Sequence, residues 1–152
     1  MIVIRPIKKQ DFRQITQIEF ESFSDPYPIY LFQYLAENAP DLFLVAIEME
    51  VPLGYIVAEI DEHAGFNIGH ILSLAVQEKQ RRKGIGHKLI SALLEILKAR
   101  RCREVVLEVR VSNYSAKIFY QKHKFQIIKR SRKYYEDGED ALVMALNLEE
   151  QL

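Results

Sequence analysis

One stretch of the sequence, residues 69–97, limits the possible folds more than any other. It begins with a short apolar run, residues 69–76, which is typical of a strand buried on both faces. It ends with apolar residues at the spacing of a buried helix face: Leu89, Ile90, Leu93, Leu94 and Leu97. Strand, turn and helix in this order indicate an α/β fold, with the turn at the end of a central strand.

The turn itself predicts an anion-binding site. The first amides of a helix lack partners inside the helix and carry the positive end of its dipole. Gly84 and Gly86 allow the backbone to approach a ligand closely, and Arg81, Arg82 and Lys83 supply positive charge for phosphate. The spacing matches neither a P-loop nor a dinucleotide-binding fingerprint. An ordinary turn with solvated charges is the alternative.

The pattern Arg81-x-x-Gly84-x-Gly86 resembles the acetyl-CoA pyrophosphate loop of the GNAT acetyltransferase superfamily. Residues 69–76, 107–113 and 133–140 resemble the protein N-terminal acetyltransferases, both the archaeal enzymes and the catalytic subunits of the eukaryotic complexes. The resemblance implies a single GNAT N-acetyltransferase domain over residues 1–152. It also implies the GNAT fold: a mixed, mostly antiparallel sheet with a splayed central parallel strand pair and helices on both faces.

Composition and charge fit this expectation. A chain of 152 residues suits one domain, and its 21 basic and 21 acidic residues create no overall field for nucleic acid or membrane. Cys102 is the only cysteine, which excludes an internal disulfide and fits a reducing compartment. No leader-like or membrane-spanning apolar segment is found, so we expect a cytoplasmic protein without nucleic-acid or membrane partners.

The hydrophobic periodicity predicts alternating strands and helices, closed by a hairpin. The first helix begins at residue 12, with Asp11 as its cap, and Asn113 caps a later helix. Residues 61–67 form a polar loop. We expect strands at 2–5, 42–49, 53–60, 69–76, 104–111, 125–132 and 141–148. The remaining helices are expected at 29–38, from the end of the glycine-containing turn to about residue 100, and at 114–122.

Two side chains on these strands are candidates for moving a proton. Glu108 lies on the polar face of its strand, where it can act as general base or be a solvated partner of Arg110 or a lysine. His70 precedes the phosphate loop, and the resemblance implies that it works with the glutamate; an ordinary core histidine is the alternative. The other histidines do not combine with His70 at metal-ligand spacing, so no metal is expected.

The resemblance also assigns residues to acetyl-CoA. The backbone of Leu74, Ala75 and Val76 pairs with the cofactor arm, and the pyrophosphate lies against Arg81, Arg82, Lys83, Gly84, Ile85, Gly86 and His87. Asn113 hydrogen-bonds the arm and Tyr120 protonates the departing thiolate, although Asn113 can be only a helix cap and Tyr120 only a core residue. Lys124 replaces a family glycine, so we expect a positive φ there. Cys102 has no histidine at motif spacing and is not expected to be a nucleophile.

Substrate recognition is implied by two further segments. Residues 24–27 resemble the loop that reads the first residues of a peptide, with Asp25 in place of the usual glutamate. Tyr27, Tyr134 and Tyr135 then form an aromatic slot, or simply pack their loops. We therefore expect transfer of acetyl from acetyl-CoA to protein N-termini by direct attack. The alternatives are a GNAT enzyme for a small amine or a lysine side chain, and a non-catalytic acyl-CoA sensor. An auxiliary subunit and ribosome association are left open.

Overall fold

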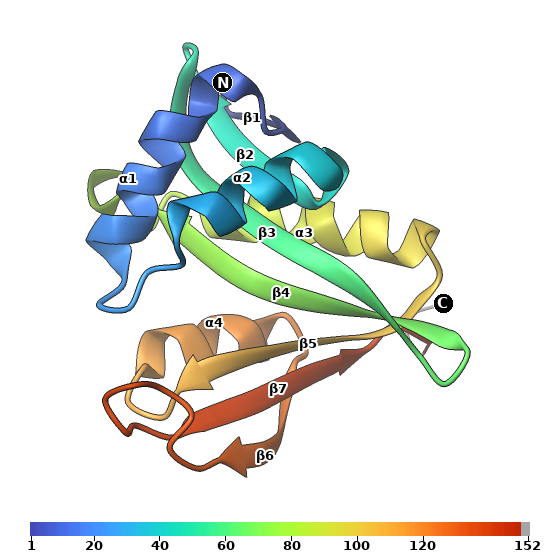
Figure 1. Ribbon diagram of the computed structural model, residues 1–152. Coiled ribbons are helices and arrows are strands. Elements are labelled where there is room, and N and C mark those ends of the chain that lie inside the picture. Colours follow the sequence, from blue (N-terminus) through green and yellow to red (C-terminus); the bar gives the residue numbers. More distant parts are fainter. Residues whose placement is uncertain (150–152) are drawn as a thin grey trace. The chain divides into compact units, whose positions relative to one another are not determined.

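The computed structural model describes residues 1–149, which form an α/β fold around a seven-stranded sheet (Figure 1). The strands are hydrogen-bonded in the order β1-β2-β3-β4-β5-β7-β6. They span β1 Val3–Pro6, β2 Phe43–Glu48, β3 Val51–His63, β4 Phe66–Val76, β5 Cys102–Arg110, β6 Gln126–Ser131 and β7 Ala141–Asn147. The helices span α1 Phe12–Ser22, α2 Ile29–Asn38, α3 Ile85–Ala99 and α4 Tyr114–Lys122, with short 3-10 turns η1 Lys9–Asp11, η2 Pro40–Leu42 and η3 Glu78–Gln80.

The sheet is mixed and mostly antiparallel, as expected. Its parallel pair is β4 with β5, in a register that runs from Asn67 opposite Cys102 to His70 opposite Val106. Both strands continue beyond this register, β4 to Val76 and β5 to Arg110. The parallel register therefore ends at the position of His70.

The chain divides into two compact units, and the first comprises residues 1–59 and 71–99. Within it, α1 and α2 cover one face of the sheet and α3 covers the other (Figure 1). The first face buries aromatic and branched side chains against the two helices, among them Ile15, Phe32, Phe43, Val45 and Tyr55. On α3, the predicted apolar stripe is fully buried at Leu89, Ile90, Leu93 and Leu97. Helices on both faces are thus confirmed within this unit.

The second unit comprises residues 60–70 and the described residues from 100 onward. In it β5 and β6 both pair with β7 in antiparallel fashion. Val105, Leu107 and Val109 are buried, as the alternation predicts, so Glu108 lies on the opposite face of β5. The amide of Ala116 donates to Oδ1 of Asn113 over 3.1 Å, which confirms the predicted cap of α4.

Two local predictions are wrong. Residues 61–67 do not form a long polar loop, because β3 continues to His63 and β4 begins at Phe66. Ala64 and Gly65 have φ of +53° and +86°, so both adopt the left-handed conformation that a two-residue hairpin turn requires. The strands therefore extend almost to the turn, and their polar side chains remain exposed.

Asp11 precedes α1 but makes no side-chain cap. Its carboxylate instead forms an ion pair with Arg5, at 2.6 and 3.1 Å, and accepts from the amide of Lys8 at 2.8 Å. The guanidinium of Arg5 is charged and makes two hydrogen bonds, so it binds the buried carboxylate of Asp11 more strongly than a helix amide would.

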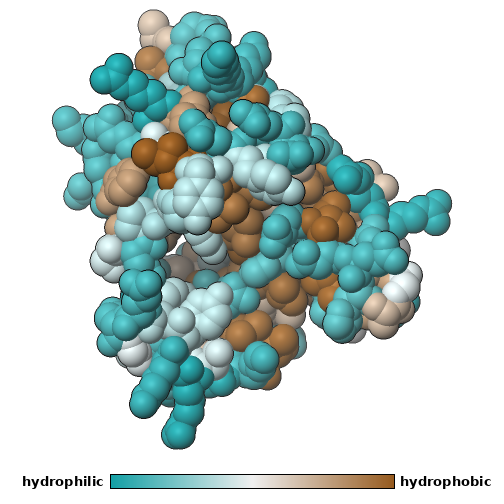
Figure 2. Space-filling model, in the orientation of Figure 1, coloured by the Kyte–Doolittle hydropathy of each residue, from teal (hydrophilic) through white to brown (hydrophobic). Residues whose placement is uncertain are grey.

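The face of the molecule shown in Figure 2 is mostly hydrophilic, with hydrophobic side chains gathered in smaller patches. Among residues 1–149, no helix combines the length and apolar character needed to cross a membrane.

Candidate active site

The structure joins the two predicted proton-moving residues directly. His70 lies opposite Val106 in the parallel pair, and Glu108 follows Val106 by two residues, so it lies on the same face of β5. Nε2 of His70 and Oε1 of Glu108 are 2.8 Å apart. Because an ionised carboxylate only accepts hydrogen bonds, Nε2 is the donor when Glu108 is ionised. In the described part of the chain, the bond observed for Glu108 is to His70 rather than to Arg110 or a lysine.

The pair remains accessible to solvent. The side chain of His70 is 23% exposed and that of Glu108 is 19% exposed. Each group is thus shielded enough to hold its geometry and open enough to exchange protons with water. A hydrogen-bonded imidazole and carboxylate of this kind can take a proton from an amine, directly or through one water molecule.

Tyr134, a third predicted site residue, belongs to the same unit and interacts electrostatically with Glu108. Partial burial, and after it the negative charge of Glu108, raise the pKa of the Tyr134 phenol. Its ring packs edge-on against Tyr135, with ring centroids 5.0 Å apart. The two tyrosines are therefore an aromatic pair, and the predicted slot that they form with Tyr27 stays a prediction.

Arg110, two residues after Glu108, holds the loop that carries these tyrosines. Its Nη1 bonds Asp137 and Glu139 at 2.9 Å each, and its guanidinium carbon lies 4.0 Å above the ring of Tyr135. Glu139 also accepts from the amide of Ser112 at 2.9 Å. The loop before β7 is thereby tied to β5 by charge-assisted bonds. The sequence analysis considered Arg110 only as a partner of Glu108 and missed this network.

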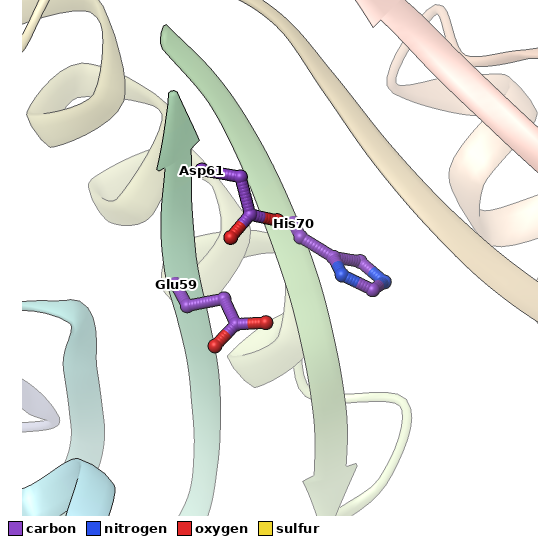
Figure 3. A group of neighbouring side chains, drawn as sticks. All are labelled: Glu59, Asp61 and His70. Carbon is purple, nitrogen blue, oxygen red and sulfur yellow. The ribbon is translucent and has the colours of Figure 1, made fainter. Parts of the chain in front are cut away.

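Within the second unit, the carboxylate of Asp61 lies near the ring of His70 (Figure 3). A carboxylate oxygen of Asp61 lies within 4.8 Å of a ring nitrogen of His70. Such spacing is compatible with a metal ion, but Asp61 is exposed and His70 is already bonded to Glu108. Exposed carboxylates near a histidine do not make a metal site by themselves, and the expected absence of a metal stays a prediction.

The predicted phosphate loop lies in the first unit, between η3 and α3. Arg82 and Gly84 have φ of +64° and +79°, and α3 begins directly after them at Ile85. A Cβ built at Gly84 would have no other atom within 4 Å, so the surface there is open. Backbone turned in this way exposes amides at a helix N-terminus, which fits an anion such as pyrophosphate. Leu74 and Val76, at the end of β4, are partly exposed.

Two of the cations in this loop bond to residues that shortly precede it in the sequence. Nε of Arg81 donates to the carbonyl of Val76 at 2.9 Å, and Nζ of Lys83 donates to Gln80 at 2.9 Å. These contacts shape the turn, so the backbone amides, rather than the side chains of these two cations, are the better candidates for direct contact with phosphate.

Tyr120, in the second unit, is 7% exposed and packs against Phe119 and Phe125. Burial strongly raises the pKa of its phenol. A tyrosine in this state keeps its proton at neutral pH, as a donor to a thiolate must. Burial likewise raises the pKa of the Cys102 thiol, which agrees with the expectation that Cys102 is no nucleophile.

The predicted peptide-reading loop belongs to the first unit. Asp25 is exposed, whereas Tyr27 is half-buried, with its ring centroid 6.3 Å from that of Phe32. The backbone amide of Tyr27 donates to the carboxylate of Glu19 at 2.9 Å. Sequence reasoning missed Glu19. The available signal was an acidic residue directly after Ile18 on the apolar face of α1, where it is 3% exposed.

Comparison with known proteins adds a family and close relatives. Residues 10–125 match the sequence model of the acetyltransferase (GNAT) family. The chain is 34% identical to N-alpha-acetyltransferase 30 of Schizosaccharomyces pombe, over 93% of this chain and 95% of that protein. It is 38% identical to an N-alpha-acetyltransferase of Saccharolobus solfataricus, over 93% of this chain and 90% of that protein.

Solved structures agree with these sequence matches. A chain in the crystal structure of the NatC complex bound to Gag peptide and CoA superposes with a TM-score of 0.91 at 30% identity, covering 97% of this chain and 98% of that one. Ard1 from Thermoplasma volcanium superposes with a TM-score of 0.88 at 29% identity, covering 96% and 97%. The fold expected from the sequence is thereby confirmed.

Proposed function

This chain belongs to the acetyltransferase (GNAT) family, and we propose that within it the chain is an N-terminal acetyltransferase, which transfers an acetyl group from acetyl-CoA to the α-amino group of proteins. The observation that carries the chemistry is the 2.8 Å bond between His70 and Glu108. The named N-alpha-acetyltransferases that match nearly the whole chain support the choice of a protein N-terminus as acceptor.

The reaction first requires a free amine. An α-amino group has a pKa of about 7.7–8.0, so most of it is protonated at neutral pH and cannot attack a thioester. His70 and Glu108 receive that proton through water: the imidazole accepts it, and the carboxylate stabilises the imidazolium that forms.

Acetyl-CoA supplies the activated acetyl group. The residues present fit such a ligand: the loop before α3 combines left-handed backbone at Arg82 and Gly84 with an open surface and neighbouring cations. In this proposal the loop from Arg81 to His87 holds the pyrophosphate, and the backbone of residues 74–76 holds the amide-bearing arm, as an added strand would be held. Asn113 keeps its capping bond and orients the arm.

The departing thiolate requires a proton. Tyr120 has a protonated hydroxyl on a buried ring, and we assign it this role. Asp25, Tyr27, Tyr134 and Tyr135 bind the first residues of the peptide, with the tyrosines contributing flat apolar surface and hydroxyl groups.

Kinetics of paired variants test the proposal. We expect Glu108→Gln and His70→Gln each to lower kcat by about 10²–10⁴-fold, the usual contribution of a general base. Because both side chains serve one proton transfer, the double variant is expected to be little worse than the worse single one. Acetyl-CoA affinity should stay unchanged, and higher pH should partly rescue all three variants by supplying free amine.

Glu104→Gln is the matched control, since Glu104 is another partly exposed glutamate of β5 and does not bond His70. Full activity of this control with multiplicative losses in the double variant would mean that His70 and Glu108 act independently. Peptides that differ only in their first two residues should be compared with small amines and with lysine side chains. Preference for either of the latter would contradict a protein N-terminus as substrate, and background rates throughout would favour an acyl-CoA sensor.

The setting in the cell follows from the same proposal. N-termini of proteins are produced at the ribosome, so the enzyme works in the cytoplasm, with ribosome association as an option that the test leaves open. The relative in the NatC complex is part of a multi-subunit assembly, which supports an auxiliary subunit as a partner here.

A further inference from the structure

A buried carboxylate in the first unit links the protein core to the loop of Asp25 and Tyr27. Oε1 of Glu19 accepts from Oγ of Ser73 at 2.7 Å and from the hydroxyl of Tyr55. Oε2 accepts from the backbone amide of Tyr27 at 2.9 Å. The two hydroxyls are themselves 3.1 Å apart. Four segments of the unit therefore converge on one side chain: α1, the loop before α2, β3 and β4.

This arrangement differs from the other buried carboxylate of the same unit. Asp11 is 1% exposed and is neutralised by Arg5, six residues away in the sequence. Glu19 is 3% exposed, and the donors that bond it are two hydroxyls and one amide, all neutral. Burying a carboxylate without a cation is unfavourable unless every bond is made. Tyr55 and Ser73 lie 36 and 54 residues from Glu19 in the sequence, so the carboxylate is held by the core, not by its own helix.

The loop of Asp25 and Tyr27 has few backbone amides that can donate a hydrogen bond. Tyr27 lies between Pro26 and Pro28, and proline has no amide hydrogen, so the Tyr27 amide is the one backbone donor of these three residues. That donor is bonded to Glu19. Asp25 is exposed two residues earlier, and the half-buried ring of Tyr27 packs near Phe32. The bond to Oε2 of Glu19 thus fixes the backbone position of Tyr27, two residues after Asp25.

We propose that Glu19 is a positioning residue for the peptide substrate: its carboxylate, fixed by Tyr55 and Ser73, holds the Tyr27 amide and so orients Tyr27 and Asp25 toward the first residues of the acceptor. This inference rests on the proposed N-terminal acetyltransferase activity. Glu19 itself touches neither the acetyl group nor the amine. Its effect is expected on peptide affinity and on ranking of peptides by first residue, not on acetyl-CoA binding.

The test replaces Glu19, which accepts the hydrogen bond of the Tyr27 amide, by a side chain of similar volume. Glu19→Met fills the same space and leaves the Tyr27 amide without a partner, while Tyr55 and Ser73 can still bond each other. We expect the peptide KM to rise roughly tenfold to a hundredfold, the loss of one hydrogen bond to a charged group, with a smaller change in kcat. Glu19→Gln retains one acceptor oxygen and should recover part of the affinity. Amide hydrogen exchange at Tyr27 should accelerate in Glu19→Met.

Asp11→Asn is the control, because it removes the charge of a buried carboxylate in the same unit that has no contact with the loop. It should lower the melting temperature and leave the peptide KM and the ranking unchanged. If Glu19→Met does not fold, Tyr55→Phe carries the test, since it deletes one donor to Oε1; a raised peptide KM with an unchanged KM for acetyl-CoA supports the inference.

Two results would overturn it, and they are distinguishable. A lower melting temperature with unchanged peptide KM and ranking would make Glu19 a purely structural residue and leave the proposed function intact. Wild-type protein that binds acetyl-CoA but acetylates no peptide in the panel would remove the proposed function, and the inference with it.

Discussion

Lys124 has a φ of +74°, directly after the C-cap of α4 and before the buried Phe125. The amides of Lys124 and Phe125 both bond back to the helix, to the carbonyls of Gln121 and Tyr120. This is a left-handed helix end, in which glycine is the usual residue because a Cβ is unfavourable. The positive φ expected at this position is confirmed.

Lys124→Gly should therefore stabilise the protein. We expect a gain of about 1 kcal/mol in the free energy of unfolding, the approximate cost of a side chain in left-handed backbone, or roughly 2–4 °C in melting temperature. Gln121→Gly, an exposed position inside α4, is the matched control and should destabilise by a similar amount. Thermal and urea denaturation measure both; destabilisation by Lys124→Gly would show that the lysine side chain contributes more than its conformation costs.

At the scale of elements, the loop between η3 and α3 combines strained backbone with internally bonded side chains. Arg82 is left-handed without being a glycine, and Arg81 and Lys83 bond to Val76 and Gln80. Side chains thus shape the turn, while in the proposed function the first amides of α3 bind the pyrophosphate. The loop is expected to bind acetyl-CoA through its backbone more than through its cations.

Calorimetry with acetyl-CoA separates the two contributions. Gly86→Glu places a side chain and a negative charge at the start of α3 and should abolish binding, whereas Arg82→Ala removes one cation and should weaken it only mildly. Glutamate near a helix N-terminus favours the helix, so unfolding is not the expected cause of the loss. Circular dichroism of both variants checks this. Equal and small effects would contradict binding by the backbone amides.

At the scale of the whole molecule, carboxylates in both units have depressed pKa values. For Asp11 in the first unit, burial alone would raise the pKa, but the bonds to Arg5 and the Lys8 amide outweigh it. In the second unit, Ser112 and Arg110 lower the pKa of Glu139, and the Lys133 amide and Arg130 lower that of Asp140. Each group binds its proton more weakly when folded, so each stabilises the fold above its unfolded pKa.

Stability should therefore fall on acidification, beginning near the ordinary carboxyl pKa of about 4 and continuing as pH drops through the lower folded values. Urea unfolding at several pH values between neutral and acid measures this. Asp11→Asn and Glu139→Gln should each flatten the pH dependence, one through the first unit and one through the second. A slope unchanged by both variants would mean that other carboxylates cause the acid sensitivity.

The sequence by itself determined most of the helices and strands, because these depend on local patterns. Helix α2 has the predicted bounds, Ile29–Asn38, and the apolar stripe of α3 is buried as its spacing requires. The Asn113 cap and the positive φ of Lys124 follow from residue types within a few positions. The prediction was wrong for Asp11, which precedes a helix as a cap does. Its carboxylate binds Arg5, six residues away, instead of a helix amide.

Only the tertiary structure decided which side chains meet. Glu108 could have bonded Arg110 on its own strand; the register of β4 against β5 placed His70 opposite Val106 instead, and so within reach of Glu108. Arg110 instead bonds Asp137 and Glu139, in the loop that also contains Tyr134 and Tyr135. Glu19 meets Tyr55 and Ser73 across 36 and 54 residues for the same reason. Such pairs depend on strand register and helix packing, which sum many weak contacts along the chain, and no short stretch of sequence encodes them.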